Sequence, residues 1–365
     1  MNNFVICATR SMRKYAAAVT RSLTGFNGFA EFESAFDGVH LLTTERFADG
    51  EMEVVISSSI RGKVVFLFTS CARNECGVSV EEAKIELYNA VDALKRAQAE
   101  KIIIFEPFVS CSRSDRITRR SSVGIWVHMK ILAGLGASHI VTYQLHSDKS
   151  KTILDPTICA IDDVPALNLL KQHLCDSYIK NIETLQEEVR NNWAFCSVDA
   201  GGEKITRDFA NAFGAPLVVA HKQRDYSKPN SLESVNILSA EPLEGKSLWI
   251  VDDMIDTAGS VQILIRALSR LAPREINLVA VHALFSPPAQ SRLSELLSEG
   301  LVKRIIVSDS VYIPASMSAE IPGIEIVSST ELSAKIIKMI VNKESLNKVL
   351  RQFNADIYLR SKAPL

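Results

Sequence analysis

The sequence predicts an α/β protein in which two successive domains each contain a mainly parallel sheet flanked by helices. Short apolar runs such as Leu248 to Val251 are continuous, as expected for strands that are covered on both faces. Stretches with apolar residues at helical spacing follow such runs, for example Val261 to Leu271, which stops before Pro273. The chain has 365 residues, which is enough for two domains of ordinary size.

The composition argues against several classes of partner. The net charge is −1, so the chain has no electrostatic attraction to nucleic acid or to an anionic membrane surface. The first residues lack the basic segment and apolar core of a signal peptide, and no apolar run approaches membrane-spanning length. The seven cysteines form no CxxC pair and lie among apolar segments, which favours buried thiols over zinc ligands or disulfides. We therefore expect a cytoplasmic protein with no nucleic-acid or membrane partner.

The first half of the chain alternates predicted strands with helices and polar turns. The predicted strands cover residues 4–8, 39–43, 54–56, 64–68, 101–105 and 139–145, and the helices cover 12–23, 80–97 and 123–135. The segment 46–51 between two strands is a loop, and taken alone its Phe47 would be interpreted as a core residue beside solvated acids.

Two groups of polar residues in this half follow strands. Arg113, Arg116, Arg119 and Arg120 form a basic cluster that suits a polyphosphate, although a solvated basic loop is the alternative. His146 comes at the end of another strand, where a histidine commonly has a structural role.

The turn-rich segment 155–165 is the predicted domain boundary. We assign residues 1–160 to the first domain, 161–345 to the second and 346–365 to a C-terminal extension. In the second domain, a strand at 193–198 leads to Asp199, Ala200, Gly201 and Gly202. Two glycines after an acid can present backbone N–H groups to a diphosphate while the acid holds Mg²⁺, although such a short motif is weak evidence by itself.

The strand at 248–251 ends in two adjacent acids and a turn of small residues. Thr257 to Ser260 would aim successive backbone N–H groups at one point near a helix N-terminus, which suits a phosphate. Asp252 and Asp253 would repel a phosphate but can accept hydrogen bonds from two neighbouring sugar hydroxyls. The expected ligand is a ribose 5-phosphate moiety, and the alternative is an ordinary turn with solvated acids. The residues assigned to this ligand are Asp252, Asp253, Asp256, Thr257, Ala258, Gly259 and Ser260.

Residues 251–261 resemble the phosphoribosyl-binding loop of the type I phosphoribosyltransferase fold. The loop alone does not separate enzymes that consume phosphoribosyl pyrophosphate from the enzyme that makes it. The order of the other motifs, over residues 4–350, is similar to that of the ribose-phosphate pyrophosphokinases. This resemblance implies two tandem phosphoribosyltransferase-like domains.

The resemblance implies the ATP site. Phe47 would stack on adenine, with Asp49 and Glu51 as acceptors near its amino group, and this segment would reach across from a neighbouring subunit. Arg113 and Ser114 would also contact ATP.

The resemblance also implies the remaining catalytic groups. His146 and Asp199 would be ligands of Mg²⁺, and residues 199–202 would bind the diphosphate being transferred. Lys222 and Arg224, at the start of an irregular polar stretch that reads as a mobile loop, would be the catalytic cations. A solvated basic turn would explain their charges but not their place in the family order.

Several positions depart from the family pattern. Ser114 and Cys111 stand where the family has Gln and Tyr, and Gln144 stands where it has Asp near the metal. Ser59 and Arg61 match the family's allosteric phosphate site, but Ser122 stands where another arginine is expected.

We therefore expect an Mg²⁺-dependent enzyme that transfers the diphosphoryl group of ATP to C1 of ribose 5-phosphate and yields AMP. It would be a homo-oligomer, a hexamer or dimer, with the ATP site shared between subunits. The alternatives are a catalytically weak regulatory homologue and a phosphoribosyltransferase.

Overall fold

The computed structural model describes residues 4–26, 39, 41–117, 120–223 and 234–362, and of Lys222, Gln223 and Ser234 it describes only the backbone. The chain divides into two compact units, each considered by itself below. Unit 1 consists of Met1–Pro165, Ser310–Tyr312 and Ser328–Leu350. Unit 2 consists of Ala166–Asp309, Ile313–Val327 and Arg351–Leu365.

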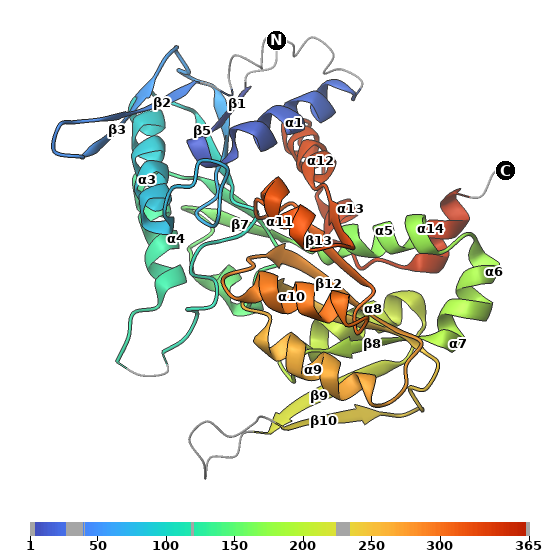
Figure 1. The fold of residues 1–365 in the computed structure, drawn as a ribbon. Helices are drawn as coiled ribbons and strands as arrows, with labels where there is room; N and C mark the ends of the chain where they lie inside the picture. The colour runs from blue at the N-terminus through green and yellow to red at the C-terminus, as the bar shows by residue number, and fades with distance from the viewer. Residues whose placement is uncertain (1–3, 27–38, 40, 118–119, 224–233, 363–365) are drawn as a thin grey trace. The chain divides into compact units, whose positions relative to one another are not determined.

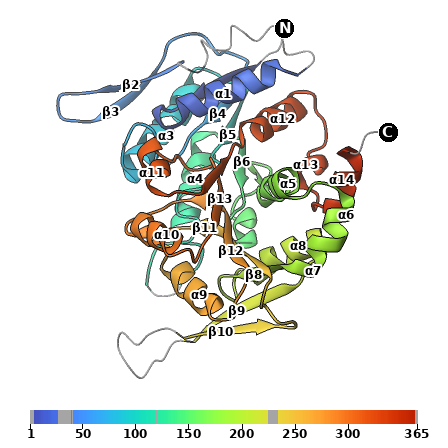
Figure 2. The same cartoon turned by 45° about the vertical axis from the view of Figure 1, so that its right-hand side comes forward.

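Unit 1 is built on a five-stranded parallel sheet in the order β1-β4-β5-β6-β7 (Figures 1 and 2). Neighbouring residues of its strands face opposite sides, so that Val65 and Leu67 belong to one core and Phe66 and Phe68 face the other side. An antiparallel hairpin, β2 and β3, stands apart from this sheet. The strands of unit 1 are β1 Phe4–Ala8, β2 Leu42–Arg46, β3 Met52–Ile56, β4 Val64–Phe68, β5 Lys101–Phe105, β6 His139–Tyr143 and β7 Ala160–Val164.

Helices cover both faces of this sheet. Helices α3 and α4 supply the core that contains Val65 and Leu67. Helix α3 begins at an N-cap, Ser79, whose side chain accepts a hydrogen bond from the Glu82 N–H. The helices of unit 1 are η1 Arg10–Met12, α1 Arg13–Thr24, α3 Val80–Arg96, α4 Gly124–Leu135, η3 Asp148–Thr152, α12 Thr330–Val341 and α13 Asn347–Leu350.

Unit 2 contains a seven-stranded sheet in the order β10-β9-β8-β11-β12-β13-β14, which is parallel except for β10. Its central strands are buried on both faces, because Leu248 and Ile250 belong to the core under α9 and α10 while Trp249 faces the aromatic residues of the other side. The strands are β8 Trp193–Ser197, β9 Leu217–Gln223, β10 Ser234–Ser239, β11 Ser247–Ile255, β12 Glu275–Ala283, β13 Arg304–Ser308 and β14 Ile324–Val327. The helices are α5 Leu167–Tyr178, α6 Ile182–Thr184, η4 Leu185–Val189, α7 Arg190–Asn192, α8 Glu203–Phe213, α9 Gly259–Ser269, α10 Ala289–Ser298, α11 Ala315–Glu320 and α14 Ala355–Lys362.

The predicted class, mainly parallel sheets flanked by helices, is confirmed. The units differ from the linear boundaries expected at residues 160 and 345. Residues 160–164, expected to belong to a turn-rich crossing, form strand β7 beside β6. Helix α12 belongs to unit 1, where the Tyr15 hydroxyl lies 2.9 Å from the Ser333 Oγ. This and neighbouring contacts hold α12 on α1, although Tyr15 and Ser333 are more than 300 residues apart in the sequence.

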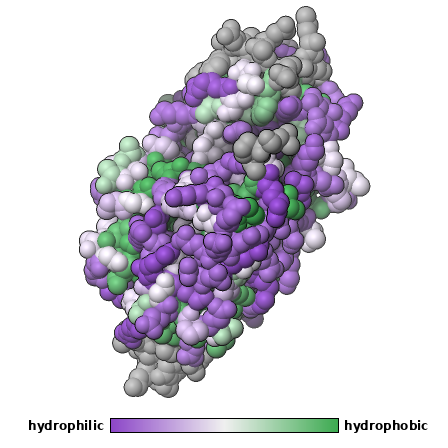
Figure 3. Space-filling model, turned by 90° about the vertical axis from the view of Figure 1, so that its right-hand side faces the viewer, coloured by the Kyte–Doolittle hydropathy of each residue, from purple (hydrophilic) through white to green (hydrophobic). Residues whose placement is uncertain are grey.

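The expected extension also divides between the units. Residues after Leu350 belong to unit 2, where the ring of Phe353 lies 6.5 Å from that of Phe213 and the Tyr358 hydroxyl donates to Asp176 over 3.0 Å. Among the described residues, no helix has the length and apolar character needed to cross a membrane. The face in Figure 3 is largely hydrophilic, with hydrophobic residues in scattered groups.

Candidate functional site

The acids of unit 2 lie near the carboxyl end of the central strand β11. This strand is longer than the predicted 248–251 and includes Asp252 and Asp253, because Met254 and Ile255 continue the pairing with β12. Asp253 is buried, with 8% of its surface exposed, and Asp252 is partly buried. The carboxyl ends of parallel strands are where open α/β sheets bind ligands.

The turn after β11 leads directly into helix α9. Ala258 has a φ of +58°, the left-handed conformation that residues other than glycine seldom adopt, and it precedes the helix without a side-chain cap. A left-handed residue beside helical ones turns successive backbone N–H groups towards one point. A Cβ on Gly259 would lie 3.0 Å from an Arg292 Nη, and the same Arg292 group donates to the Thr257 carbonyl over 2.9 Å. The turn therefore has the backbone geometry of an anion site, held by Arg292.

The loop after β8 folds around Asp199. Its Oδ1 accepts hydrogen bonds from the Gly201 N–H over 2.9 Å and from the Gly202 N–H over 3.1 Å. We predicted that these N–H groups would face a diphosphate, whereas here they hold the carboxylate. Residue Ser197 pairs with Val251, so the Asp199 loop and the acids of β11 follow neighbouring strands.

The three carboxylates of Asp199, Asp252 and Asp253 influence one another. Burial, followed by the charges of Asp253 and Asp199, raises the pKa of Asp252 well above its usual value. A cation, or donors from sugar hydroxyls, would relieve this repulsion. Among the described residues, no three His, Cys, Asp or Glu side chains form a metal cage by themselves. The oxygen donors of these carboxylates are the kind that Mg²⁺ takes in proteins, commonly one or two carboxylates together with substrate phosphates.

The predicted adenine-binding segment forms the tip of the β2–β3 hairpin in unit 1. The Phe47 N–H donates to the Glu51 carbonyl over 2.9 Å, and the Glu51 N–H donates to Asp49 Oδ1 over 3.0 Å. Arg46 fixes the tip by donating to the Gly50 carbonyl over 2.8 Å. Phe47 is 55% exposed, so the alternative that it is a core residue is wrong. A ring presented on an ordered hairpin can stack on a planar ligand.

The loop after β5 carries Arg113 and Ser114. Arg113 is exposed, whereas the Ser114 hydroxyl accepts from the Gly124 N–H over 2.9 Å and donates to the Ser122 carbonyl over 3.4 Å. Ser114 thus closes the loop that leads into α4, in addition to any contact with ATP. Arg116 and Arg120 are exposed, and Arg119 lies outside the described residues.

His146 is exposed in the turn after β6, two residues after Gln144, whose φ is +46°. The turn is held by Asp163, whose Oδ1 accepts from the Leu145 N–H over 2.9 Å and whose Oδ2 lies 3.0 Å from Lys151 Nζ. Burial raises the pKa of Asp163, although the hydrogen bonds from Leu145 and Lys151 stabilise the carboxylate and act in the opposite direction. The sequence reasoning missed Asp163 because it lies in the segment interpreted as a crossing.

One of the two predicted catalytic cations, Lys222, lies in the described part of the chain. Lys222 belongs to β9, which continues to Gln223 and pairs with β10, so it lies in a strand and not in the irregular loop that we predicted. Arg224 lies outside the described residues. Within unit 2 the structure thus brings the Asp199 loop close to the acids of β11, while Phe47, Arg113 and His146 lie on three separate loops of unit 1.

Comparisons with known proteins agree with this architecture. A model of the N-terminal domain of ribose phosphate pyrophosphokinase matches residues 4–136, and a phosphoribosyl transferase domain matches residues 168–307. A ribose-phosphate pyrophosphokinase from Fusobacterium nucleatum is 30% identical over 306 residues, which cover 84% of this chain and 88% of the relative. One from Bacillus caldolyticus is 32% identical over 273 residues, covering 74% and 78%.

A solved structure shows the same fold. The phosphoribosylpyrophosphate synthetase from Mycobacterium smegmatis superposes with a TM-score of 0.76 at 24% identity, over 93% of this chain and 99% of the other. The predicted pair of phosphoribosyltransferase-like domains is therefore confirmed. Together, the two matched domains and the identity of 30% or more over most of the chain show that this protein belongs to the ribose-phosphate pyrophosphokinase family.

Proposed function

We infer that this protein transfers the diphosphoryl group of ATP to C1 of ribose 5-phosphate, giving 5-phosphoribosyl 1-diphosphate and AMP for nucleotide biosynthesis. The observation that carries this inference is the order of groups at the end of β11, where two acids precede a left-handed turn and an uncapped helix, in a chain of this family. The products also distinguish this activity from that of a phosphoribosyltransferase, which consumes 5-phosphoribosyl 1-diphosphate.

Ribose 5-phosphate would bind in unit 2. Asp252 and Asp253 would accept hydrogen bonds from the sugar hydroxyls, which carry no charge and so add nothing to the repulsion among the acids. The backbone N–H groups of Thr257 to Ser260 would bind the 5-phosphate, helped by the positive end of the α9 dipole.

ATP would bind to the loops of unit 1. Phe47 would stack on adenine, Asp49 and Glu51 would accept from its amino group, and Arg113 would bind phosphate oxygens. We propose that the hairpin tip serves a neighbouring subunit, so that the enzyme works as a homo-oligomer. The exposure of Phe47 supports this proposal, because burying an apolar ring against a ligand is favourable.

Asp199 of unit 2 would be a Mg²⁺ ligand of the diphosphate loop, already oriented by the two glycine N–H groups, and His146 of unit 1 would be a ligand of the Mg²⁺ bound to ATP. Bound Mg²⁺ would neutralise charge on the phosphoryl oxygens. All seven cysteines are free thiols, five of them buried, which fits a reducing compartment, and a cytoplasmic location is part of the proposal.

The chemistry requires no covalent enzyme intermediate. The C1 oxygen of the sugar forms a bond to the β-phosphorus, the bond from that phosphorus to the α,β-bridging oxygen breaks, and the hydroxyl proton is lost. The chain's task is to align the two oxygens and to hold the charge that spreads over the transferred group. Lys222 and Arg224 would supply that charge stabilisation, and each ~1.4 kcal/mol of selective stabilisation is worth about tenfold in rate.

The test is an incubation of the purified protein with ATP, Mg²⁺ and ribose 5-phosphate, followed by chromatography of the nucleotides. We expect AMP to form only when ribose 5-phosphate is present, in a one-to-one ratio to 5-phosphoribosyl 1-diphosphate. Binding of both substrates without turnover would instead indicate a regulatory homologue. Consumption of 5-phosphoribosyl 1-diphosphate with a nucleobase would indicate a phosphoribosyltransferase.

A further inference from the structure

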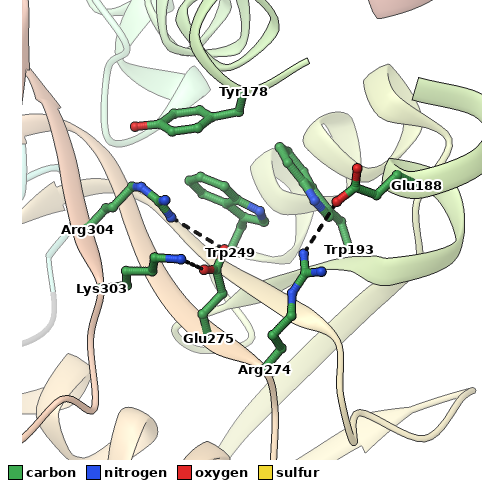
Figure 4. Close-up of a pocket in the computed structure, with 8 residues that line it drawn as sticks. All are labelled: Tyr178, Glu188, Trp193, Trp249, Arg274, Glu275, Lys303 and Arg304. Carbon is green, nitrogen blue, oxygen red and sulfur yellow. Dashed lines mark hydrogen bonds and ion pairs between the residues drawn. The ribbon is translucent and has the colours of Figure 1, made fainter. Parts of the chain in front are cut away.

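Unit 2 contains a cavity of about 390 Å³ at the amino ends of its strands (Figure 4). Trp193, Glu275 and Arg304 are the first residues of β8, β12 and β13, and Trp249 lies near the start of β11. The acids of unit 2 that are assigned to substrates lie near the opposite ends of these strands, with Asp252 and Asp253 in the carboxyl half of β11 and Asp199 just after β8, and none of them lines this cavity. The lining residues are Tyr178, Glu188, Trp193, Trp249, Arg274, Glu275, Lys303 and Arg304.

Three aromatic rings form one wall of the cavity. The ring centres of Trp193 and Trp249 are 4.8 Å apart, and those of Tyr178 and Trp249 are 5.8 Å apart. The Arg304 guanidinium lies over the Tyr178 ring, 4.8 Å from its centre. Trp193 is 5% exposed and Trp249 is 1% exposed, so this wall offers ring edges, and not open stacking faces, to a planar group.

One polar group in this wall has no hydrogen-bond partner in the part of the chain that the structure describes. Trp249 is 1% exposed, and its indole N–H makes no hydrogen bond with any described residue. Figure 4 shows the indole nitrogen on the side of the ring that faces Trp193 and Arg274. Leaving a buried donor unpaired is costly, so an acceptor atom of a ligand on this side would gain a full hydrogen bond.

The rest of the lining is charged, with three cations against two carboxylates. Glu275 is well satisfied, because it accepts from the Ser247 hydroxyl over 3.1 Å and pairs with Lys303 and with Arg304. Burial alone would raise the pKa of Glu275, but hydrogen bonds from Lys303 and Asn277 outweigh it and hold the pKa below its usual value. The carboxylate therefore stays ionised, and the cavity carries one net positive charge.

Arg274 is the cation best placed to bind a further anion. Its closest approach to Glu188 is 3.7 Å, and both side chains are about half exposed, so this ion pair is weak. Its Nε and one Nη donate to the Ser247 hydroxyl over 3.1 and 2.8 Å. A guanidinium has five N–H donors, so it can bind an anion while it keeps these two bonds.

We propose that this cavity binds a nucleoside monophosphate or a ligand of that chemistry, with a planar heteroaromatic ring and an anionic group. The ring would meet the edges of Trp193 and Trp249 and accept from the Trp249 N–H, and the anion would bind Arg274 and Lys303. The volume is within the range of small-molecule sites. This inference does not depend on the proposed function, because it concerns other residues at the opposite end of the sheet.

The test is titration calorimetry with guanosine 5′-monophosphate and uridine 5′-monophosphate, with ribose 5-phosphate held at saturation. At least one nucleotide should bind with a Kd below about 1 mM, and the matching nucleoside and inorganic phosphate should each bind at least about tenfold more weakly, because each lacks one of the two recognised groups. Absence of measurable binding of both nucleotides up to about 5 mM would overturn the proposal.

Two variants locate the binding. Trp249→Phe keeps an aromatic ring and removes the N–H, and Lys303→Gln removes a half-exposed charge at the rim, so each should weaken binding at least about fivefold. The matched controls are Trp126→Phe and Lys101→Gln, two exposed residues of unit 1, which should leave the affinity within about twofold. Lys303 lies on the surface, so Lys303→Gln should not impair folding. If this variant binds the nucleotide as tightly as the parent protein does, the nucleotide binds elsewhere and the proposal is wrong.

Discussion

The two glycines after Asp199 offer a sharp test of the diphosphate loop, because the structure predicts opposite effects on stability for the same change. A Cβ on Gly201 would lie 3.2 Å from Asp199 Oδ1, the atom that accepts the Gly201 and Gly202 N–H bonds. A Cβ on Gly202 would meet nothing closer than 3.8 Å, and the φ of Gly202 is −79°, which alanine adopts readily. Gly202→Ala is therefore the structurally neutral member of the pair.

The expected stabilities follow from these contacts. Gly202→Ala should stabilise the protein by about 0.4–1 kcal/mol, because alanine restricts the unfolded chain. Gly201→Ala has the same gain but displaces a carboxylate from a charge-assisted hydrogen bond, and for this partly exposed pair we take the lower end of the usual cost, about 1.5 kcal/mol. The two variants should then differ by about 1.5 kcal/mol, or roughly 3–6 °C in Tm for a domain of this size.

The activities should not follow the stabilities. If the loop approaches the transferred diphosphate, the methyl group of Gly202→Ala displaces the diphosphate although the free protein is not strained. A displacement of this kind costs on the order of 100-fold in kcat/KM. The assay is AMP release at saturating ATP and varied ribose 5-phosphate, beside thermal unfolding of the same preparations. A Gly202→Ala protein that is as active as the parent would show that this backbone does not approach the substrate.

Two substitutions and one activation experiment test the other assignments. Lys222→Ala should lower kcat at least about 100-fold with a smaller change in KM, as expected for a contact made mainly in the transition state. Steady-state kinetics measure both constants, and near-normal turnover would remove Lys222 from the mechanism. Asp253→Asn should weaken equilibrium binding of ribose 5-phosphate more than that of ATP, and the opposite order would mean that the two substrates are assigned to the wrong units. Ser122 stands where we expect an arginine of the family's phosphate site, and losing one Arg–phosphate contact costs about 1.5–3 kcal/mol, so activation by inorganic phosphate should be weak or absent. A steep rise in initial rate at low millimolar phosphate would contradict this.

The sequence predicted the fold class because both sheets are covered on two faces. Strands such as 64–68 and 248–251 must then be continuous apolar runs, which are easy to recognise. Strand β7 was missed because it lies at the sheet edge and is mostly half-buried, so Ala160–Val164 includes two acids and no apolar run. The assignment of α12 to unit 1 depends on contacts over 300 residues apart, such as Tyr15 with Ser333, which local patterns do not contain.

The candidate site was predictable to the extent that its chemistry is local. The acids of β11 and the left-handed turn at Ala258 follow one another in sequence, and a phosphate site of this kind is built from consecutive backbone N–H groups. Asp163 and Arg292 were not predicted, because each orients a loop from a different element. The same reason applies to the cavity around Trp249, which four strands of the sheet and the segment of Tyr178 to Glu188 form together.

In the proposed reaction, both terminal phosphoryl groups of ATP move together to ribose 5-phosphate. The most direct measurement uses ATP labelled separately with ³²P at the α-, β- or γ-phosphate and follows each label into the products. We expect the β and γ labels to appear in 5-phosphoribosyl 1-diphosphate and the α label to stay in AMP. Transfer of the γ label alone, with ADP as the second product, would contradict it.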